Sequence, residues 1–102
     1  MLKIISPESL KKYLSQKNTL LLDLRDKTDY DKEHIAGAVW ADWETLENEI
    51  DKFVPKTSGD ELTIILYCDK GTISLLTGRN LSLKGYNVIS LKGGYDGLKE
   101  KL

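Results

Sequence analysis

Three short, mostly apolar runs punctuate the chain. They cover Thr19–Leu24, Leu62–Tyr67 and Asn87–Leu91. None of them shows the strict apolar-polar alternation of a strand with one face in water. Runs of this length predict strands of a parallel sheet that is covered on both faces.

Between these runs, apolar residues recur at the spacing of one helix face. Ser6 and Pro7 suit the N-cap and first turn of one helix, and Gly85 suits the position just beyond the end of another. Helices are therefore expected over residues 7–18, 43–53, 72–84 and 95–102. Strands alternating with helices predict an α/β domain. Residues 55–61 have the composition of a loop inside that domain.

Length and charge narrow the classes of function. The 102 residues suffice for one domain, expected to span residues 1–102. Fifteen Lys and Arg residues against sixteen Asp and Glu residues give a net charge of −1, which exerts no general attraction on nucleic acid or an anionic membrane surface. The N-terminus lacks a signal-peptide core, and no apolar stretch is long enough to span a membrane. We therefore expect a cytoplasmic protein that binds neither nucleic acid nor a membrane.

Cys68 is the only cysteine and His34 the only histidine. One cysteine cannot form an internal disulfide, and one residue of each kind cannot build a closed zinc site. No metal and no cofactor is expected. Any chemical role of Cys68 is therefore that of a thiol.

Cys68 ends the second apolar run, and the segment Cys68–Ser74 leads into the next predicted helix. In an open parallel sheet, ligands bind beyond the carboxyl ends of the strands. N–H groups of the loop and of the helix N-terminus can converge on the sulfur there and favour an anion. The position alone favours the simpler interpretation of a small buried core residue.

Three blocks of sequence, in order and at matching separations, resemble the rhodanese-like sulfurtransferase family. The family patterns are L-D-x-R with an acidic-Tyr pair and G-H-I-x-G-A, then C-x-x-G-x-R-S with L-x-x-x-G-Y/F, then L-x-G-G-aromatic. The matching residues here are Leu22–Arg25, Asp29–Tyr30 and His34–Ala38, then Cys68–Ser74, Leu81 and Gly85–Tyr86, then Leu91–Tyr95. The resemblance implies a five-stranded parallel sheet with helices on both faces, its further strands lying near Ile4 and Val39.

The resemblance also implies a single-domain sulfurtransferase of the thiosulfate type. In that family the loop cysteine, here Cys68, takes sulfane sulfur from a donor as a persulfide and passes it to a thiophilic acceptor. The expected donor is thiosulfate, a polysulfide or a protein-borne persulfide. The expected acceptor is cyanide or a thiol, including a thiol of an acceptor protein. Substrate is expected to contact Asp69, Lys70, Gly71, Thr72, Ile73 and Ser74.

One departure from the family pattern lies inside the loop. Ile73 stands where arginine is common, which removes a cation that could hold an anionic donor. Lys70 adds positive charge nearby, while Asp69 opposes an incoming dianion. We therefore expect weak use of thiosulfate and better use of donors that carry less charge.

Two alternative functions stay open. The missing arginine also fits a non-catalytic binding or regulatory module that keeps the fold. Dual-specificity phosphatases of the cell cycle share the fold, but they need arginine six positions after the cysteine, where Ser74 stands. Phosphatase activity is therefore disfavoured.

Other polar residues of the three blocks are expected to support structure rather than chemistry. His34 is expected to tie a turn by hydrogen bonds, and Arg25 to bond Asp29 or Glu33. Gly93–Gly94 lacks the spacing of a phosphate-binding loop and is expected to form a turn.

Overall fold

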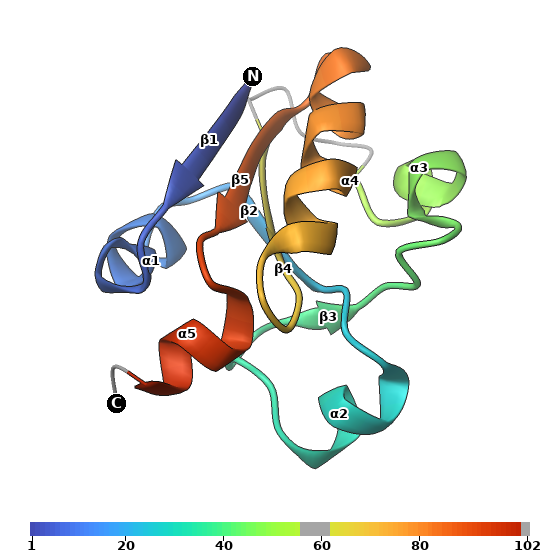
Figure 1. The fold of residues 1–102 in the computed structure, drawn as a ribbon. Coiled ribbons are helices and arrows are strands. Elements are labelled where there is room, and N and C mark those ends of the chain that lie inside the picture. Colours follow the sequence, from blue (N-terminus) through green and yellow to red (C-terminus); the bar gives the residue numbers. More distant parts are fainter. Residues whose placement is uncertain (56–61, 101–102) are drawn as a thin grey trace.

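All strands belong to one parallel sheet (Figure 1). The structure is a computed structural model that describes residues 1–55 and 62–100. The strand order is β1-β5-β4-β2-β3, and every neighbouring pair is parallel, which confirms the predicted five-stranded parallel α/β sheet. The strands are β1 (Leu2–Ile5), β2 (Thr19–Asp23), β3 (Val39–Trp40), β4 (Thr63–Tyr67) and β5 (Asn87–Leu91). Beyond Pro55, the loop predicted over 55–61 lies outside the described residues.

The helices differ from the prediction mainly where few apolar residues support them. They are α1 (Pro7–Leu14), α2 (Lys27–Lys32), α3 (Leu46–Glu49), the 3-10 helix η1 (Ile50–Lys52), α4 (Thr72–Leu83) and α5 (Gly94–Glu100). The first ends before Asn18 because residues 15–18 are all polar and exposed. The predicted helix over 43–53 is reduced to α3 and η1, and α2, whose only apolar residue is Tyr30, was not predicted.

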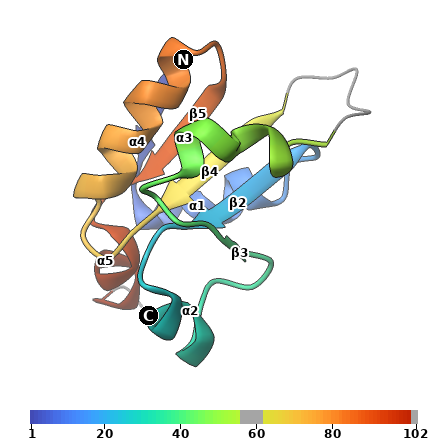
Figure 2. The same ribbon diagram turned by 90° about the vertical axis from the view of Figure 1, so that its right-hand side faces the viewer.

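Helices cover both faces of the sheet, as predicted. Side chains of β4 alternate between the faces, so Ile64 and Leu66 lie in one core and Ile65 and Tyr67 in the other. The first core lies under α3, η1 and α4, and the second lies under α1, α2 and α5. Figures 1 and 2 show α1 on the side of the sheet opposite α3 and α4.

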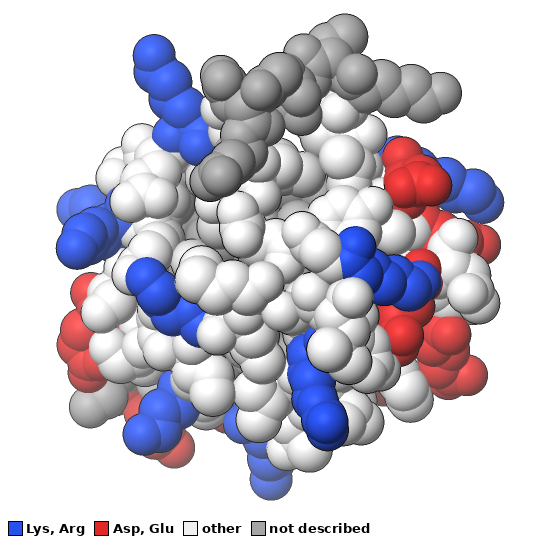
Figure 3. Space-filling model, turned by 90° about the horizontal axis from the view of Figure 1, so that it is seen from above, with Lys and Arg blue, Asp and Glu red and all other residues white. Residues whose placement is uncertain are grey.

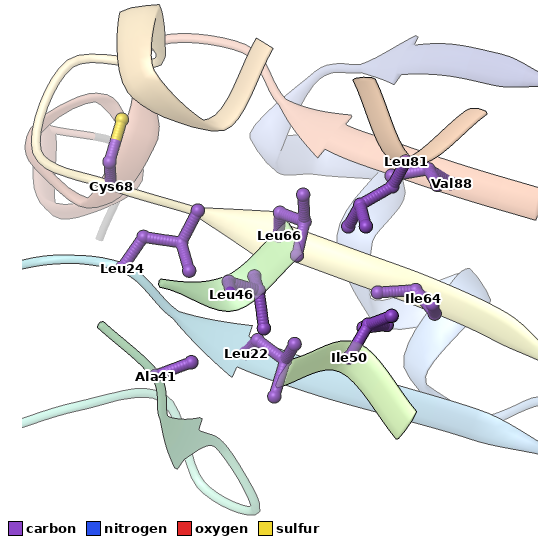
Figure 4. Packing of buried hydrophobic residues seen from close by; sticks show 10 residues of the cluster. All are labelled: Leu22, Leu24, Ala41, Leu46, Ile50, Ile64, Leu66, Cys68, Leu81 and Val88. Atoms are coloured by element: carbon purple, nitrogen blue, oxygen red, sulfur yellow. The ribbon is translucent and has the colours of Figure 1, made fainter. Parts of the chain in front are cut away.

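The first core holds the end of β4 in place. Leu22, Ile64, Leu66 and Leu81 are fully buried in it (Figure 4). Each such side chain stabilises the folded chain by about 1.5 to 3 kcal/mol. Because Cys68 belongs to the same cluster, its backbone is fixed by these contacts.

The surface carries charges of both signs. On the face seen from above Figure 1, basic side chains stand apart from one another and acidic side chains gather toward the edges (Figure 3). This scatter agrees with the net charge of −1. Within residues 1–55 and 62–100, no helix is long and apolar enough to cross a membrane.

Candidate active site

Cys68 lies directly after β4, the middle strand of the sheet. The residue is only 3% exposed. Figure 4 shows its sulfur pointing away from the leucine side chains toward the loop that leads into α4. The predicted place of the thiol, at the carboxyl end of a strand rather than within it, is therefore what the structure shows.

Two backbone N–H groups donate to this sulfur. The N–H of Gly71 lies 3.1 Å and the N–H of Ser74 lies 3.4 Å from Sγ. Ser74 is in the first turn of α4, where N–H groups have no acceptor within the helix. Gly71 has φ +97°, a left-handed conformation that glycine adopts without strain, and this lets the loop turn back over the sulfur. The loop therefore directs two N–H donors at Sγ.

A pair of buried hydroxyls also lies close to the sulfur. The thiol of Cys68 donates to Ser74 Oγ at 3.7 Å, and Ser74 Oγ lies 2.8 Å from Ser90 Oγ of β5. Ser74 also donates to the carbonyl oxygen of Gly71 at 3.3 Å. Both serines are almost completely buried. Ser90 was not predicted as part of the site, although a serine inside an otherwise apolar strand is a signal for a polar role.

The turn at Gly93–Gly94 fixes the backbone of the same loop. The N–H of Tyr95 donates to the carbonyl of Cys68 at 2.8 Å, and the N–H of Asp96 donates to the carbonyl of Asp69 at 3.0 Å. Gly94 has φ +62°, and a Cβ atom there would collide with the carbonyl oxygens of Cys68 and Asp69. The prediction of a turn is confirmed, and the structure adds that this turn packs directly on the thiol loop.

A cavity of about 300 Å³ opens over the sulfur. Its lining residues are Cys68, Asp69, Lys70, Thr72 and Ile73. With Gly71 and Ser74 bonded to Sγ, the structure brings all seven predicted site residues together around one thiol. Lys70 is exposed, whereas the side chain of Ile73 is half-buried and packs against the first core.

The carboxyl group of Asp69 stands at the mouth of this cavity. Burial raises the pKa of Asp69 above the ordinary value of 3.8, and the nearby negative charges of Asp29 and Asp96 raise it further. The positive charge of Arg25 acts in the opposite direction. The electrostatic field at this side of the mouth therefore disfavours an additional anion.

A buried ion pair lies beside the site at the end of β2. The guanidinium of Arg25 bonds the carboxylate of Asp23 through Nε and Nη2, with Nη2 at 2.8 Å from Oδ2. The hydroxyl of Tyr67 donates to the same carboxylate at 2.7 Å. Burial raises the pKa of Tyr67 above its ordinary range, and the bond to Asp23 raises it further. The tyrosine therefore stays protonated and acts as a donor.

The partners expected for Arg25 need correction. Its carboxylate partner is Asp23, not Asp29, and its bond to Glu33 reaches the backbone carbonyl at 2.6 Å. Asp23 is preferred because it lies two residues away on the strand end, where its oxygens also accept the backbone N–H of Arg25. The guanidinium also lies over the ring of Tyr95, 4.1 Å from the centroid, so it connects β2 to α5.

His34 supports the turn after α2. Its Nδ1 lies 2.7 Å from the carbonyl oxygen of Tyr30, and the two rings stack with centroids 3.8 Å apart. A carbonyl only accepts, so Nδ1 donates and ties the turn after α2, as predicted. Within the described residues, no cluster of His, Cys, Asp and Glu side chains could hold a metal ion.

The sequence of this chain matches a family of known proteins. The model of the rhodanese-like domain family matches residues 6–101. This chain belongs to that family. The resemblance drawn from the three sequence blocks is thereby confirmed.

Curated relatives of this rhodanese-like domain include sulfurtransferases. The thiosulfate sulfurtransferase GlpE of Coxiella burnetii is 28% identical over 97 residues, which cover 94% of this chain and 86% of GlpE. A tRNA sulfurtransferase of Desulfurococcus amylolyticus is 30% identical over 77 residues, but the match covers only 14% of that enzyme. The comparisons therefore support membership of a sulfurtransferase family.

Solved structures agree with the fold of this rhodanese-like domain. A rhodanese-like domain protein from Staphylococcus aureus superimposes with a TM-score of 0.77 at 22% identity, covering 94% of this chain and 90% of that one. A rhodanese-like domain from Anabaena superimposes with a TM-score of 0.80 at 25% identity, covering 99% of this chain and 76% of that one. At 22% identity the first of these likenesses shows the fold alone.

Proposed function

We propose that this rhodanese-like domain is a sulfurtransferase that carries sulfane sulfur as a persulfide on Cys68. The observation that carries the proposal is the pair of N–H groups, from Gly71 and Ser74, that donate to a sulfur at the base of an open cavity. This arrangement stabilises an anionic sulfur without a base beside it. The 28% identity to GlpE over most of both chains supports the same chemistry.

The first step is attack by the Cys68 thiolate on the outer sulfur of a donor. With thiosulfate the sulfur-sulfur bond breaks, its electron pair leaves with sulfite, and Cys68 becomes a persulfide anion. With a polysulfide the leaving group is the chain shortened by one sulfur. The new terminal sulfur extends into the cavity, where the first N–H groups of α4, from Thr72 and Ile73, can stabilise its charge.

The second step returns Cys68 to the thiolate. The acceptor attacks the terminal sulfur, the bond to Sγ breaks, and the electron pair stays on Sγ. Cyanide leaves as thiocyanate and a thiolate leaves as a persulfide. Because Sγ alternates between thiolate and persulfide, the same two N–H donors stabilise the thiolate released by each turnover.

Polysulfide or a protein-borne persulfide suits this loop better than thiosulfate. Ile73 presents a half-buried apolar side chain at the mouth. The raised pKa of Asp69 indicates that even one negative charge is disfavoured there. A dianion gains only Lys70 as a cation among the residues lining the mouth. We also propose that the six residues after Cys68 contact the substrate, as the sequence predicted.

Intact-mass spectrometry tests the proposal directly. The chain is incubated with inorganic polysulfide or with thiosulfate, desalted and weighed. We expect the mass to rise by one sulfur atom and to return to its starting value after cyanide is added, with thiocyanate released. Cys68→Ser is the matched control, since it removes the only thiol and should gain no sulfur.

A non-catalytic module is the second candidate, and the specific observation in its favour is Ile73 in place of arginine. It predicts no sulfur gain from any donor while the fold stays intact. A stable persulfide that cyanide or thiol removes would exclude this candidate. A thiol acceptor protein, the span of the domain over residues 1–102 and a cytoplasmic location stay predictions.

A further inference from the structure

A second, smaller cavity adjoins the mouth over the thiol. Its volume is about 180 Å³, and it lies between the turn before α3 and the first turns of α4. Thr72 and Ile73 line both cavities, so the two are neighbours that share a wall. A molecule whose sulfur approaches Cys68 can therefore extend its other end past Ile73 into this space.

Three of the side chains that line this cavity are large and apolar, namely Trp43, Ile73 and Leu76. Trp43 is 41% exposed and Leu76 is 60% exposed, and Ile73 is half-buried between the cavity and the first core. Trp43 and Leu76 are large apolar side chains that lie partly in water beside Cys68, so they lack the stabilisation that burial would give. A ligand that covers them recovers part of that free energy.

The charge around this cavity has one sign. Glu44 and Glu47 line it, and no Lys or Arg residue is among its described lining residues. Glu47 is held in place by the amide of Asn80, which donates to its carboxylate at 3.0 Å. Lys70 lines the cavity over the thiol instead. An anionic group is therefore disfavoured beside Trp43 and Leu76, and these exposed apolar side chains favour a hydrocarbon group.

The size of the cavity limits its occupant. About 180 Å³ is the space of roughly six waters at liquid density. This accommodates a short carbon chain and excludes a folded segment of another protein. Thr77 and Asn80 of α4 also line the cavity, and the wall that it shares with the mouth is formed by Thr72 and Ile73.

We propose that the cavity lined by Trp43, Ile73 and Leu76 binds the uncharged carbon substituent of an organic persulfide, R–S–S–H, that serves as sulfur donor. This inference rests on the proposed function of Cys68. The Cys68 thiolate attacks the terminal sulfur, the S–S bond breaks, and its electron pair goes to the R–S sulfur. The proton of the donor's S–H passes to that sulfur, so the products are R–SH and the Cys68 persulfide anion. Cavity contacts hold R while this exchange occurs.

The test compares donors that differ only in R. Persulfides with methyl, propyl and pentyl groups are used at equal concentration, with inorganic polysulfide as the donor without carbon and a carboxylate-bearing persulfide of propyl length. The rate of sulfur gain on Cys68 is followed by intact mass. We expect the rate to rise by up to about fourfold for each methylene added, since each buried methylene contributes about 0.8 kcal/mol. The carboxylate donor should be slower than propyl.

Leu76→Ser is the diagnostic variant, because the side chain is exposed and its loss should leave folding intact. It should lower the rate with the pentyl donor roughly threefold to tenfold and leave inorganic polysulfide unchanged. Leu83→Ser is the matched control, since Leu83 is on the same helix, 78% exposed, and outside both cavities. It should change neither rate.

The outcomes separate this inference from the proposed function. If inorganic polysulfide loads Cys68 but the rate is independent of chain length, the cavity does not bind the substituent and the inference is wrong. The same holds if Leu76→Ser and Leu83→Ser behave alike. If no donor loads Cys68, including inorganic polysulfide, it is the sulfurtransferase proposal that fails.

Discussion

Ser90 Oγ lies 2.8 Å from Ser74 Oγ, which accepts from the thiol of Cys68. With the thiol protonated, Ser74 accepts from the sulfur and donates to the carbonyl of Gly71. With an anionic sulfur, the Ser74 hydroxyl can turn and donate to Sγ, and its oxygen is then left to accept from another hydroxyl. Ser90 is positioned to be that donor. The pair therefore responds to the charge on the sulfur.

Ser90→Ala should slow sulfur loading roughly threefold to tenfold, because one hydrogen bond that orients Ser74 is lost, about 1 kcal/mol. The rate of sulfur gain is measured by intact mass, and unfolding by urea is measured alongside it. Ser82→Ala, in the last turn of α4, removes a half-buried hydroxyl outside the site and should leave the loading rate unchanged. Equal rates for wild type and Ser90→Ala would show that Ser74 needs no partner.

Gly94→Ala should destabilise the chain by about 2 to 4 kcal/mol and impair loading of Cys68. The added Cβ collides with the carbonyl oxygens of Cys68 and Asp69, and φ +62° is strained for alanine. Gly97→Ala in the same helix is the control, since the nearest atom to its Cβ outside the local chain is 3.6 Å away. It should gain up to about 1 kcal/mol from helix propensity. Urea denaturation of both variants measures the difference.

Arg25→Met should lower the free energy of unfolding by about 3 to 5 kcal/mol, since it leaves the buried Asp23 carboxylate without its cation. Lys27→Met breaks an ion pair whose side chains are 55% and 57% exposed, so its effect should stay below about 1 kcal/mol. Urea denaturation measures both losses. Similar losses in the two variants would contradict a structural role for the buried pair.

Ile73→Arg should raise the affinity for thiosulfate about tenfold to a hundredfold, the equivalent of about 1.5 to 3 kcal/mol for a charged hydrogen bond. The rate with inorganic polysulfide should stay within a few-fold, because the N–H groups of Gly71 and Ser74 are untouched. Leu83→Arg adds the same charge at the far end of α4 and should leave thiosulfate use unchanged. Steady-state kinetics with both donors decide; tight thiosulfate binding in the natural chain, unaltered by Ile73→Arg, would mean that Lys70 or the backbone holds the anion.

Asp69→Asn should stabilise the chain at neutral pH. The pKa of Asp69 is raised by burial and by Asp29 and Asp96, so the folded chain holds its proton more tightly than the unfolded chain. The contribution of Asp69 to stability is therefore full below the ordinary value of 3.8 and is lost as the pH rises through the raised pKa. Asparagine cannot ionise, so the variant does not lose this stability as the pH rises. The advantage of the variant should appear at neutral pH and disappear below pH 3.8; an advantage independent of pH would contradict the assignment.

The sequence was informative wherever one segment alone determines the structure. The apolar runs at Thr19–Leu24 and Leu62–Tyr67 become β2 and β4, because burial on both faces requires continuous apolar residues. The loop after β4 was predictable, since a cysteine and a glycine at that spacing precede the apolar residues of α4. The short α2 was not, because its sequence has one apolar residue and no helical period.

Contacts between distant segments escaped prediction. Ser90 contacts Ser74 only because β5 pairs with β4, and no local sequence pattern predicts that pairing. Gly94 meets Cys68 for the same reason. The pairing of Arg25 with Asp23 rather than Asp29 depends on how the chain leaves β2. Sequence patterns therefore predicted the position of the thiol and its loop, and the fold supplied the groups that hold them.

The bonds from Tyr95 and Asp96 to the thiol loop also set an order of events during synthesis. Residues 94–96 leave the ribosome well after Cys68, and β1 acquires its partner strand only when residues 87–91 have emerged. Until then the loop after Cys68 lacks the hydrogen bonds that Tyr95 and Asp96 donate to its carbonyl groups. The thiol loop therefore reaches its final geometry only after residues 94–96 have been added and have docked on it.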